Sequence, residues 1–245
     1  MAPANLKQAM SQAASLPEDL VRQATYRRNG LAVFGDLDLR HTALLVMNMQ
    51  NAWLANGAPF RVGTPELFDG LLDRINAFAR FVREGGGQVA WIRTTVGAPG
   101  TTRYWSTYYD NFIEPVKRAV AVAALTPGHP MHSLYPDAQV MPADWVLDKY
   151  RFNAFACNPY DLDARLRERG IDSVIVAGTA TNICCETTIR DAMTRDFRTF
   201  MPHDLVAAPT EDGQRAGLRS VMQAFADVRG TDDLTYTGGR TPQVP

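Results

Sequence analysis

The sequence has few cysteines and almost no net charge. It contains three cysteines in 245 residues, and an odd number of this kind argues against a disulfide framework and fits a reducing compartment. The formal net charge is -1, so the chain has no bulk attraction for nucleic acid or for an anionic membrane surface. We therefore expect a cytoplasmic protein with neither a nucleic-acid partner nor a membrane partner.

Long apolar runs are missing as well. No stretch approaches the roughly 20 apolar residues that span a bilayer. Residues 1–20, MAPANLKQAMSQAASLPEDL, lack the continuous apolar region of a signal peptide. The length and a hydrophobic content of 46% suit one globular α/β domain. We expect residues 1–40 to form a peripheral extension that contributes to a subunit interface, and residues 41–245 to form the domain.

Within that domain, strand-like apolar runs alternate with helical patterns. The predicted strands are residues 42–48, 88–95, 144–149, 173–178 and 198–207. The predicted helices are residues 65–86, 113–125 and 161–170, a helix that follows residue 178, and residues 210–227. This alternation predicts an α/β fold with a central, mostly parallel sheet flanked by helices, because each crossover must pack on a face of the sheet.

Active sites in such folds lie beyond the carboxyl ends of the strands. Asn48 leaves the first predicted strand, Lys149 closes the third, and a cysteine pair follows the fourth. Cys184 would lie in the first turn of a helix, where free N–H groups and the helix dipole stabilise a thiolate. Because helix neighbours point about 100° apart, at most one of the two cysteines would face the strand ends. The alternative is that both are small core residues.

The start of that helix has its own sequence signals. Thr181 or Asn182 could cap it, and Glu186 is placed for a capping box. Lys149 would act as a fixed positive charge beside the thiolate.

Together these stretches resemble the isochorismatase-like cysteine hydrolases. Those proteins carry a strand ending in D-M-Q-N, a later strand ending in Lys before an aromatic residue, and the motif G-x-A-T-x-x-C-V-E-x-T-x-R-D. The counterparts here are NMQN (48–51), KYRFNAF (149–155) and GTATNICCETTIRD (178–191). The third motif is similar to the ureidoacrylate and N-carbamoyl amidohydrolase branch. The resemblance spans residues 42–207 and implies that residues 41–245 form a hydrolase domain with a three-layer Rossmann-like fold.

The resemblance also implies a reaction. Cys184 would attack an amide or ureido carbonyl and form an acyl-enzyme that water hydrolyses, with Lys149 as its triad partner. Backbone N–H groups near Ala180 and Cys184 would hold the oxyanion, and a cis peptide is expected at Thr179–Ala180. Cys185 stands where the family usually has Val, so we expect it to pack in the core. No cofactor and no metal are expected.

One catalytic position departs from the family. The triad acid is Asp, whereas this chain has Asn48, which cannot take up or deliver a proton at neutral pH. Two interpretations stay open. Asn48 could be a deliberate Asp-to-Asn exchange that keeps substrate intact, or a natural residue of a divergent member whose catalysis is altered, weak or absent.

The substrate is expected to be a small linear amide, ureido or carbamoyl compound. The residues expected to bind it are Trp53, Phe152, Gln50, Trp105, Tyr108 and Arg93. Tyr109 is a further aromatic candidate, and Arg103 and Arg151 are further candidates for a substrate carboxylate, because guanidinium binds that group with two hydrogen bonds.

Other functions and sites are weaker predictions. The alternatives are an isochorismatase-type vinyl-ether hydrolase and a binding protein that has lost catalysis. His129 and His132 lack nearby metal-binding partners in the sequence, and His203 is a weak candidate for a Cys–His pair. Because relatives form dimers or tetramers, we expect a homodimer or homotetramer.

Overall fold

The computed structural model of the chain describes residues 16, 19–20, 32–60, 68–156 and 158–237. These residues contain a six-stranded sheet in the order β3-β2-β1-β4-β5, with β6 paired to β4. Every pairing between these strands is parallel, as the alternating pattern predicted. The strands are β1 (Thr42–Met47), β2 (Gln88–Thr94), β3 (Trp145–Lys149), β4 (Ser173–Thr179), β5 (Arg198–Phe200) and β6 (Val206–Ala207).

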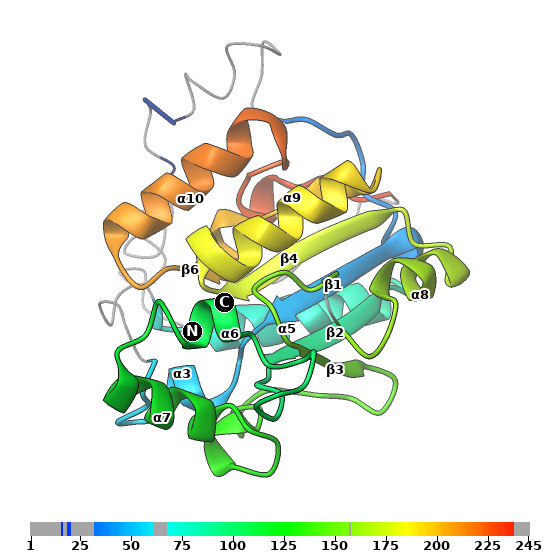
Figure 1. Cartoon of the computed structure of the whole chain (residues 1–245). Coiled ribbons are helices and arrows are strands. Elements are labelled where there is room, and N and C mark those ends of the chain that lie inside the picture. The colour runs from blue at the N-terminus through cyan, green and yellow to red at the C-terminus, as the bar shows by residue number, and fades with distance from the viewer. Residues whose placement is uncertain (1–15, 17–18, 21–31, 61–67, 157, 238–245) are drawn as a thin grey trace.

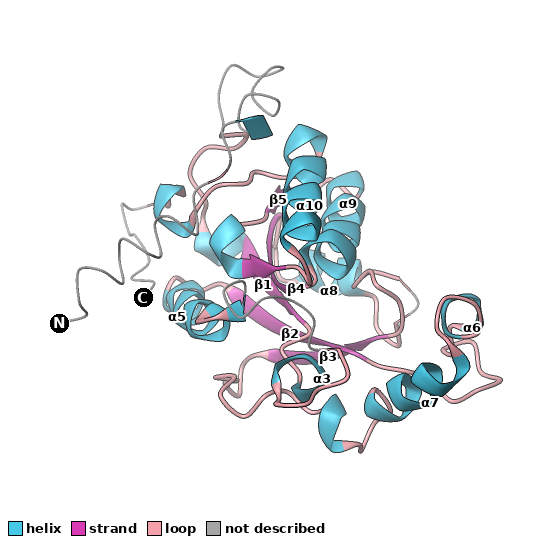
Figure 2. Cartoon of the chain, turned by 90° about the vertical axis from the view of Figure 1, so that its left-hand side faces the viewer, coloured by secondary structure: helices cyan, strands magenta, loops and turns pink. Residues whose placement is uncertain are grey.

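Helices cover both faces of the sheet and make the fold three-layered. Figures 1 and 2 show α5 on one face and α8, α9 and α10 on the other. The remaining short helices follow β1 and β2 at the carboxyl edge of the sheet. The helices are α3 (Asn51–Leu54), α5 (Leu71–Glu84), α6 (Ser106–Tyr109), α7 (Pro115–Ala124), α8 (Leu162–Glu168), α9 (Glu186–Thr194) and α10 (Glu211–Ala224).

The pleat of β1 divides the core into two parts. All six residues of β1 are buried, and successive side chains of a strand point to opposite faces. Leu45 and Met47 join the cluster beneath α8, α9 and α10, whereas Leu44 and Val46 join the cluster beneath α5. A central strand buried on both faces explains the continuous apolar run, which lacks polar alternation.

The predicted strand over residues 198–207 is wrong in one respect, because it is two short strands. β5 ends at Phe200, and Pro202 and a 3-10 turn, His203–Leu205, separate it from β6. Proline has no N–H to donate to a sheet ladder. The predicted helix over residues 65–86 is interrupted: Phe68 is helical, and Gly70, in the left-handed region at φ 65°, separates it from α5, which begins at Leu71; residues 61–67 lie outside the described part.

Part of the predicted N-terminal extension packs on the domain. Leu37 forms a parallel bridge with Tyr236, and the Asp227 carboxylate accepts hydrogen bonds from the backbone N–H groups of Val33 and Phe34. Leu20 is buried in the cluster beneath α10. The expected interface role of the extension stays a prediction, and most of residues 1–31 lies outside the described residues. In the described part, no helix has the length and apolar character needed to cross a membrane.

Candidate active site

The site lies where the strand order reverses. β1 and β4 are neighbours, and the chain order runs outward in opposite directions on either side of them, which is where ligands bind in open parallel sheets. Lys149 at the end of β3 donates a hydrogen bond from Nζ to Cys184 Sγ over 3.4 Å. The structure thus brings together two side chains that are 35 positions apart in the sequence.

Cys184 sits in a π-helical turn, Thr181–Cys185, that leads into α9. The predicted side-chain cap is wrong: Ala180 is the N-cap residue and no side chain caps the turn. Thr181 Oγ1 instead donates to Gln214 Oε1 of α10 at 2.6 Å, and Glu186 accepts from Ser220 of α10 at 2.5 Å. Contacts with α10 therefore hold the cysteine turn in place. Turns of this type are often found at functional sites.

The two cysteines have different surroundings. Cys185 is completely buried, and its Sγ faces Ala177 O at 3.9 Å. Burial raises the pKa of the Cys185 thiol well above its usual value, and the neighbouring Cys184 adds to this. Cys185 is thus a neutral packing residue, as expected, and Cys184 is the one that meets Lys149.

The peptide bond between Thr179 and Ala180 is cis, as the resemblance implied. Gly178 precedes it with φ 101°, in a region that favours glycine. A Cβ atom at Gly178 would lie 2.1 Å from Met47 O, so the close approach of β1 and β4 at this point requires glycine.

Lys149 is completely buried. Its ammonium group donates to Thr94 Oγ1 at 2.5 Å, Arg151 O at 3.3 Å and Cys184 Sγ at 3.4 Å. Among the described residues, no carboxylate forms an ion pair with it. A buried charged group needs partners, and Cys184 Sγ is the one side-chain sulfur among the three acceptors of Lys149.

Asn48 closes the other side of the site. It is 1% exposed and adopts φ 58°, a left-handed conformation in which Asn and Asp are enriched. Its Nδ2 donates to Thr179 O at 2.6 Å, and its Oδ1 accepts from Thr94 Oγ1 at 2.7 Å. Thr94, which sequence reasoning missed, therefore stands between Asn48 and Lys149.

The side chain of Gln50 is hydrogen-bonded within the protein. Its Oε1 accepts from Thr94 N at 2.7 Å, and its Nε2 donates to Thr94 O at 3.1 Å and to His132 O at 2.8 Å. The side chain is completely buried, and both amide hydrogens are used. Gln50 fixes the end of β2, and substrate binding by Gln50 stays a prediction.

Aromatic rings form a wall near Cys184. Phe152 makes edge contacts with Trp105 at 4.7 Å and with Tyr108 at 4.9 Å between ring centroids, so three of the predicted binding residues cluster. Burial raises the pKa of Tyr108 and of Tyr109; the proximity of Cys184 adds to the effect for Tyr108, and the proximity of Tyr108 and then of Cys184 adds to it for Tyr109. Trp53 stacks on Phe60 at 5.1 Å, and its role in binding stays a prediction.

The arginine candidates differ in position. Thr94 and Lys149 are partners in the β2–β3 register, as are Arg93 and Asp148. Because successive side chains alternate, Arg93 points to the opposite face of the sheet from Lys149, and it pairs with Asp148 at 2.7 Å. Arg93 is thus not among the side chains beside Lys149, and substrate binding by Arg93 stays a prediction.

Arg151 is the arginine that meets the aromatic wall. Its guanidinium lies 5.3 Å from the centroid of the Trp105 ring. It also donates to the carbonyl oxygens of Tyr150, Arg103 and Thr102. Arg103 itself lies over the Tyr150 ring at 5.4 Å. Carboxylate binding by Arg151 stays a prediction.

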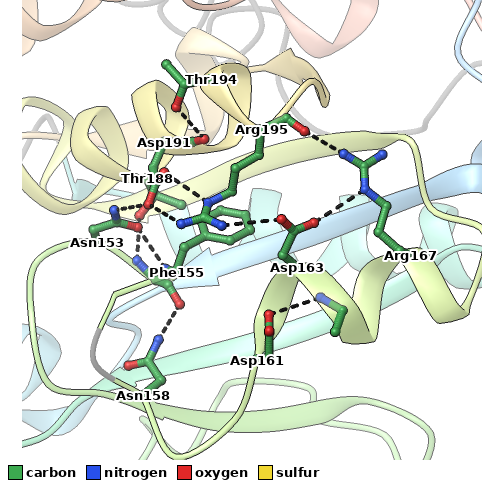
Figure 3. A network of polar contacts seen from close by, with 12 residues as sticks. Asn153, Phe155, Asn158, Asp161, Asp163, Arg167, Thr188, Asp191, Thr194 and Arg195 are labelled. Atoms are coloured by element: carbon green, nitrogen blue, oxygen red, sulfur yellow. Dashed lines mark hydrogen bonds and ion pairs between the residues drawn. The ribbon is translucent and has the colours of Figure 1, made fainter.

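A polar network holds the loop that carries Phe152 (Figure 3). Asn153 Nδ2 donates to Asp191 Oδ2 at 2.6 Å, and Ala154 N donates to Thr188 Oγ1 at 3.1 Å. Asp191 also pairs with Arg195 at 2.9 Å. The loop after β3 is thus tied to α9, the helix that follows Cys184.

We expect Asp191→Ala to destabilise the protein and to weaken substrate binding. The exchange leaves Asn153 and Arg195 without their shared partner, at a cost of about 1 to 3 kcal/mol in the free energy of unfolding. Denaturant unfolding measures this loss, and KM should rise because the loop that positions Phe152 loosens. Glu168→Ala, at an exposed position on α8, is the control. Equal unfolding curves for the two variants would contradict this role.

His132 and His203 have partners other than Cys184 and Lys149. His132 is buried and bonded to Thr95 Oγ1 at 2.8 Å, and burial lowers its pKa. Burial also lowers the pKa of His203. The next residue, Asp204, accepts two hydrogen bonds from Thr231. No three His, Cys, Asp or Glu side chains gather as a metal site in the described ranges.

Comparison with known proteins identifies the family. A model of the isochorismatase domain matches residues 42–233. The chain belongs to the isochorismatase domain family. Within this family it is 26% identical over 216 residues to ureidoacrylate amidohydrolase RutB of Caulobacter segnis, across 83% of this chain and 88% of that relative.

Two solved structures confirm the α/β fold. A cysteine hydrolase from Pseudomonas syringae pv. phaseolicola gives a TM-score of 0.70 at 24% identity, covering 81% of this chain and 92% of that one. N-carbamoylsarcosine amidase from Thermoplasma acidophilum gives a TM-score of 0.60 at 23% identity, covering 79% and 98%.

Proposed function

We propose that this member of the isochorismatase family is a cysteine-dependent amidohydrolase of small linear amide, ureido or carbamoyl compounds. The observation that carries the proposal is the contact between the buried Lys149 ammonium and Cys184 Sγ, at 3.4 Å. Among the described residues no carboxylate pairs with Lys149, which leaves its ammonium group directed at Cys184, and the thiolate is the nucleophilic form of cysteine. The names of the relatives support the substrate class.

In the proposed reaction, Cys184 Sγ forms a bond to the carbonyl carbon of the substrate, and the carbonyl oxygen becomes an oxyanion. Backbone N–H groups of Ala180 and Cys184 would stabilise this charge. The C–N bond then breaks as the leaving nitrogen takes up a proton from the Lys149 ammonium. Water gives a proton back to Lys149 as it attacks the thioester, the C–S bond breaks, and the acid product leaves with the Cys184 thiolate regenerated.

Proton transfer is the slow part of the proposed reaction in this protein. Asn48 occupies the place of the family's acid but can neither accept the proton of a thiol nor give one to the leaving nitrogen. The Lys149–Cys184 pair supplies a nucleophile without that acid, and Lys149 is the one remaining proton donor that contacts Cys184 in the described site. We propose that hydrolysis is slow for this reason and that substrate binding is retained. The aromatic wall of Trp105, Tyr108 and Phe152 would bind the rest of the substrate.

A screen for ammonia release tests this function. The purified protein is incubated with N-carbamoyl amino acids, ureidoacrylate-type acids and simple primary amides, and product is followed over hours to allow for slow turnover. We expect at least one ureido or carbamoyl compound to release ammonia in a Cys184-dependent manner. Calorimetry on the same compounds detects binding, and binding without any Cys184-dependent product would favour the binding-protein alternative.

A further inference from the structure

The polar groups of the site form a hydrogen-bond chain with a single direction. Lys149 Nζ donates to Thr94 Oγ1 at 2.5 Å, and an ammonium cannot accept a hydrogen bond. The one hydroxyl hydrogen of Thr94 is therefore free to point only at Asn48 Oδ1, at 2.7 Å. This places the Asn48 amide hydrogens toward Thr179 O, at 2.6 Å. The chain runs from Lys149 through Thr94 and Asn48 to the peptide that precedes the cysteine turn.

The Thr94 hydroxyl also completes the set of three acceptors around the Lys149 ammonium. An ammonium group has three N–H bonds, and Lys149 Nζ has three acceptors: Thr94 Oγ1, Arg151 O and Cys184 Sγ. Each N–H can thus meet one acceptor. If the hydroxyl were missing, one N–H of a completely buried ammonium would lack a partner, which is costly for a charged group.

The protein fixes Thr94 on several sides. Gln50 holds both its backbone N–H and its carbonyl oxygen, at 2.7 and 3.1 Å. The β2–β3 register places Thr94 beside Lys149. Thr94 is only partly buried, whereas the Lys149 side chain that its hydroxyl contacts is completely buried.

We infer that Thr94 is a positioning residue for the proposed hydrolysis: its hydroxyl holds the Lys149 ammonium against Cys184 and links Lys149 to position 48. The inference rests on the proposed function, because it requires Cys184 to react as a thiolate. Thr94 touches neither the sulfur nor, in the proposed reaction, the scissile bond; it acts through Lys149.

The test follows alkylation of Cys184 by iodoacetamide, with mass spectrometry to locate the adduct, between about pH 5 and pH 10. Thr94→Val keeps the shape of the side chain but removes the hydroxyl. We expect alkylation of Cys184 at about pH 7 to slow by about tenfold and the curve of alkylation rate against pH to move to higher pH. The reason is the loss of a hydrogen bond to the charged Lys149 ammonium. Thr94→Ser should restore the wild-type profile. Thr126→Val, at an exposed position, is the matched control.

The outcomes separate the two ideas. If Cys184 of the folded wild type takes no label, the proposed function fails and the inference fails with it. If wild type and Thr94→Val share one pH profile while both label at Cys184, the inference alone is overturned. Thermal melting checks the fold, and Thr94→Ala serves as a second hydroxyl-free variant where Thr94→Val melts early. Slow alkylation of Cys184 in the Thr94→Ser variant would also contradict a role for the hydroxyl.

Discussion

Replacing Cys184 by Ala or Ser should abolish turnover, whereas Cys185→Val should leave it nearly unchanged. Cys184 Sγ is the sulfur that contacts Lys149, at 3.4 Å, and loss of a nucleophile lowers kcat by about 10³-fold or more. Cys185 is completely buried against Ala177, so a swap for an apolar residue of similar size should cost less than about 1.5 kcal/mol of stability. Steady-state ammonia release measures both variants.

The pair of variants carries its own control, because the two positions are adjacent. Both exchanges alter the same π-helical turn, so damage to the fold would affect them alike, and thermal melting would reveal it. Equal loss of turnover with intact folds would mean that both thiols serve the reaction. Loss in Cys185→Val alone would mean that the nucleophile is assigned to the wrong cysteine.

The sheet and the Cys184–Lys149 pair were predictable because both follow from patterns along the chain. Buried strands such as β4 read as continuous apolar runs, and parallel strands bring their carboxyl ends to one edge. The motif around Cys184 fixes its place relative to that edge. The end of β1 at Met47 was within one residue of the prediction.

What could not be predicted depends on register and on packing between distant elements. Arg93 and Thr94 are adjacent in sequence, but the β2–β3 register gives them partners on opposite faces of the sheet. A threonine carries no sequence signal that distinguishes a site residue from an ordinary strand residue. Gln50 lies two positions after Asn48, and the sequence gives no sign that the end of β2 and the loop at His132 take up its amide group.

The cysteine turn shows the same limit. Thr181 has the side chain of a helix cap, but Gln214 of α10 takes its hydroxyl. Competition of this kind between a local cap and a tertiary partner is decided by packing that the local sequence does not encode.

Asn48→Asp should raise the rate of hydrolysis by about 10²- to 10⁴-fold, or roughly 3 to 5 kcal/mol of barrier. The exchange keeps the shape of the side chain and supplies the missing proton-transfer group. As a carboxylate, the new side chain would accept the hydrogen bond of Thr94 Oγ1, as Asn48 Oδ1 does at 2.7 Å. As a protonated acid, it could donate to Thr179 O, which accepts from Asn48 Nδ2 at 2.6 Å. The site thus accommodates both states of an acid–base group.

Ammonia release by the wild type and by Asn48→Asp is compared on a compound that the wild type binds by calorimetry. Asn48→Ala serves as the control, since it removes the side chain without adding an acid and should be no faster than the wild type. We expect the gain mainly in kcat. Proton transfer occurs in the transition state, whereas the wild type, with Asn48, already makes the interactions that bind the substrate. If Asn48→Asp is folded, binds the compound and is no faster, then the absent carboxylate does not limit this protein. Asn48 would then be compatible with catalysis in a divergent member of the family, and Lys149 alone would transfer the proton.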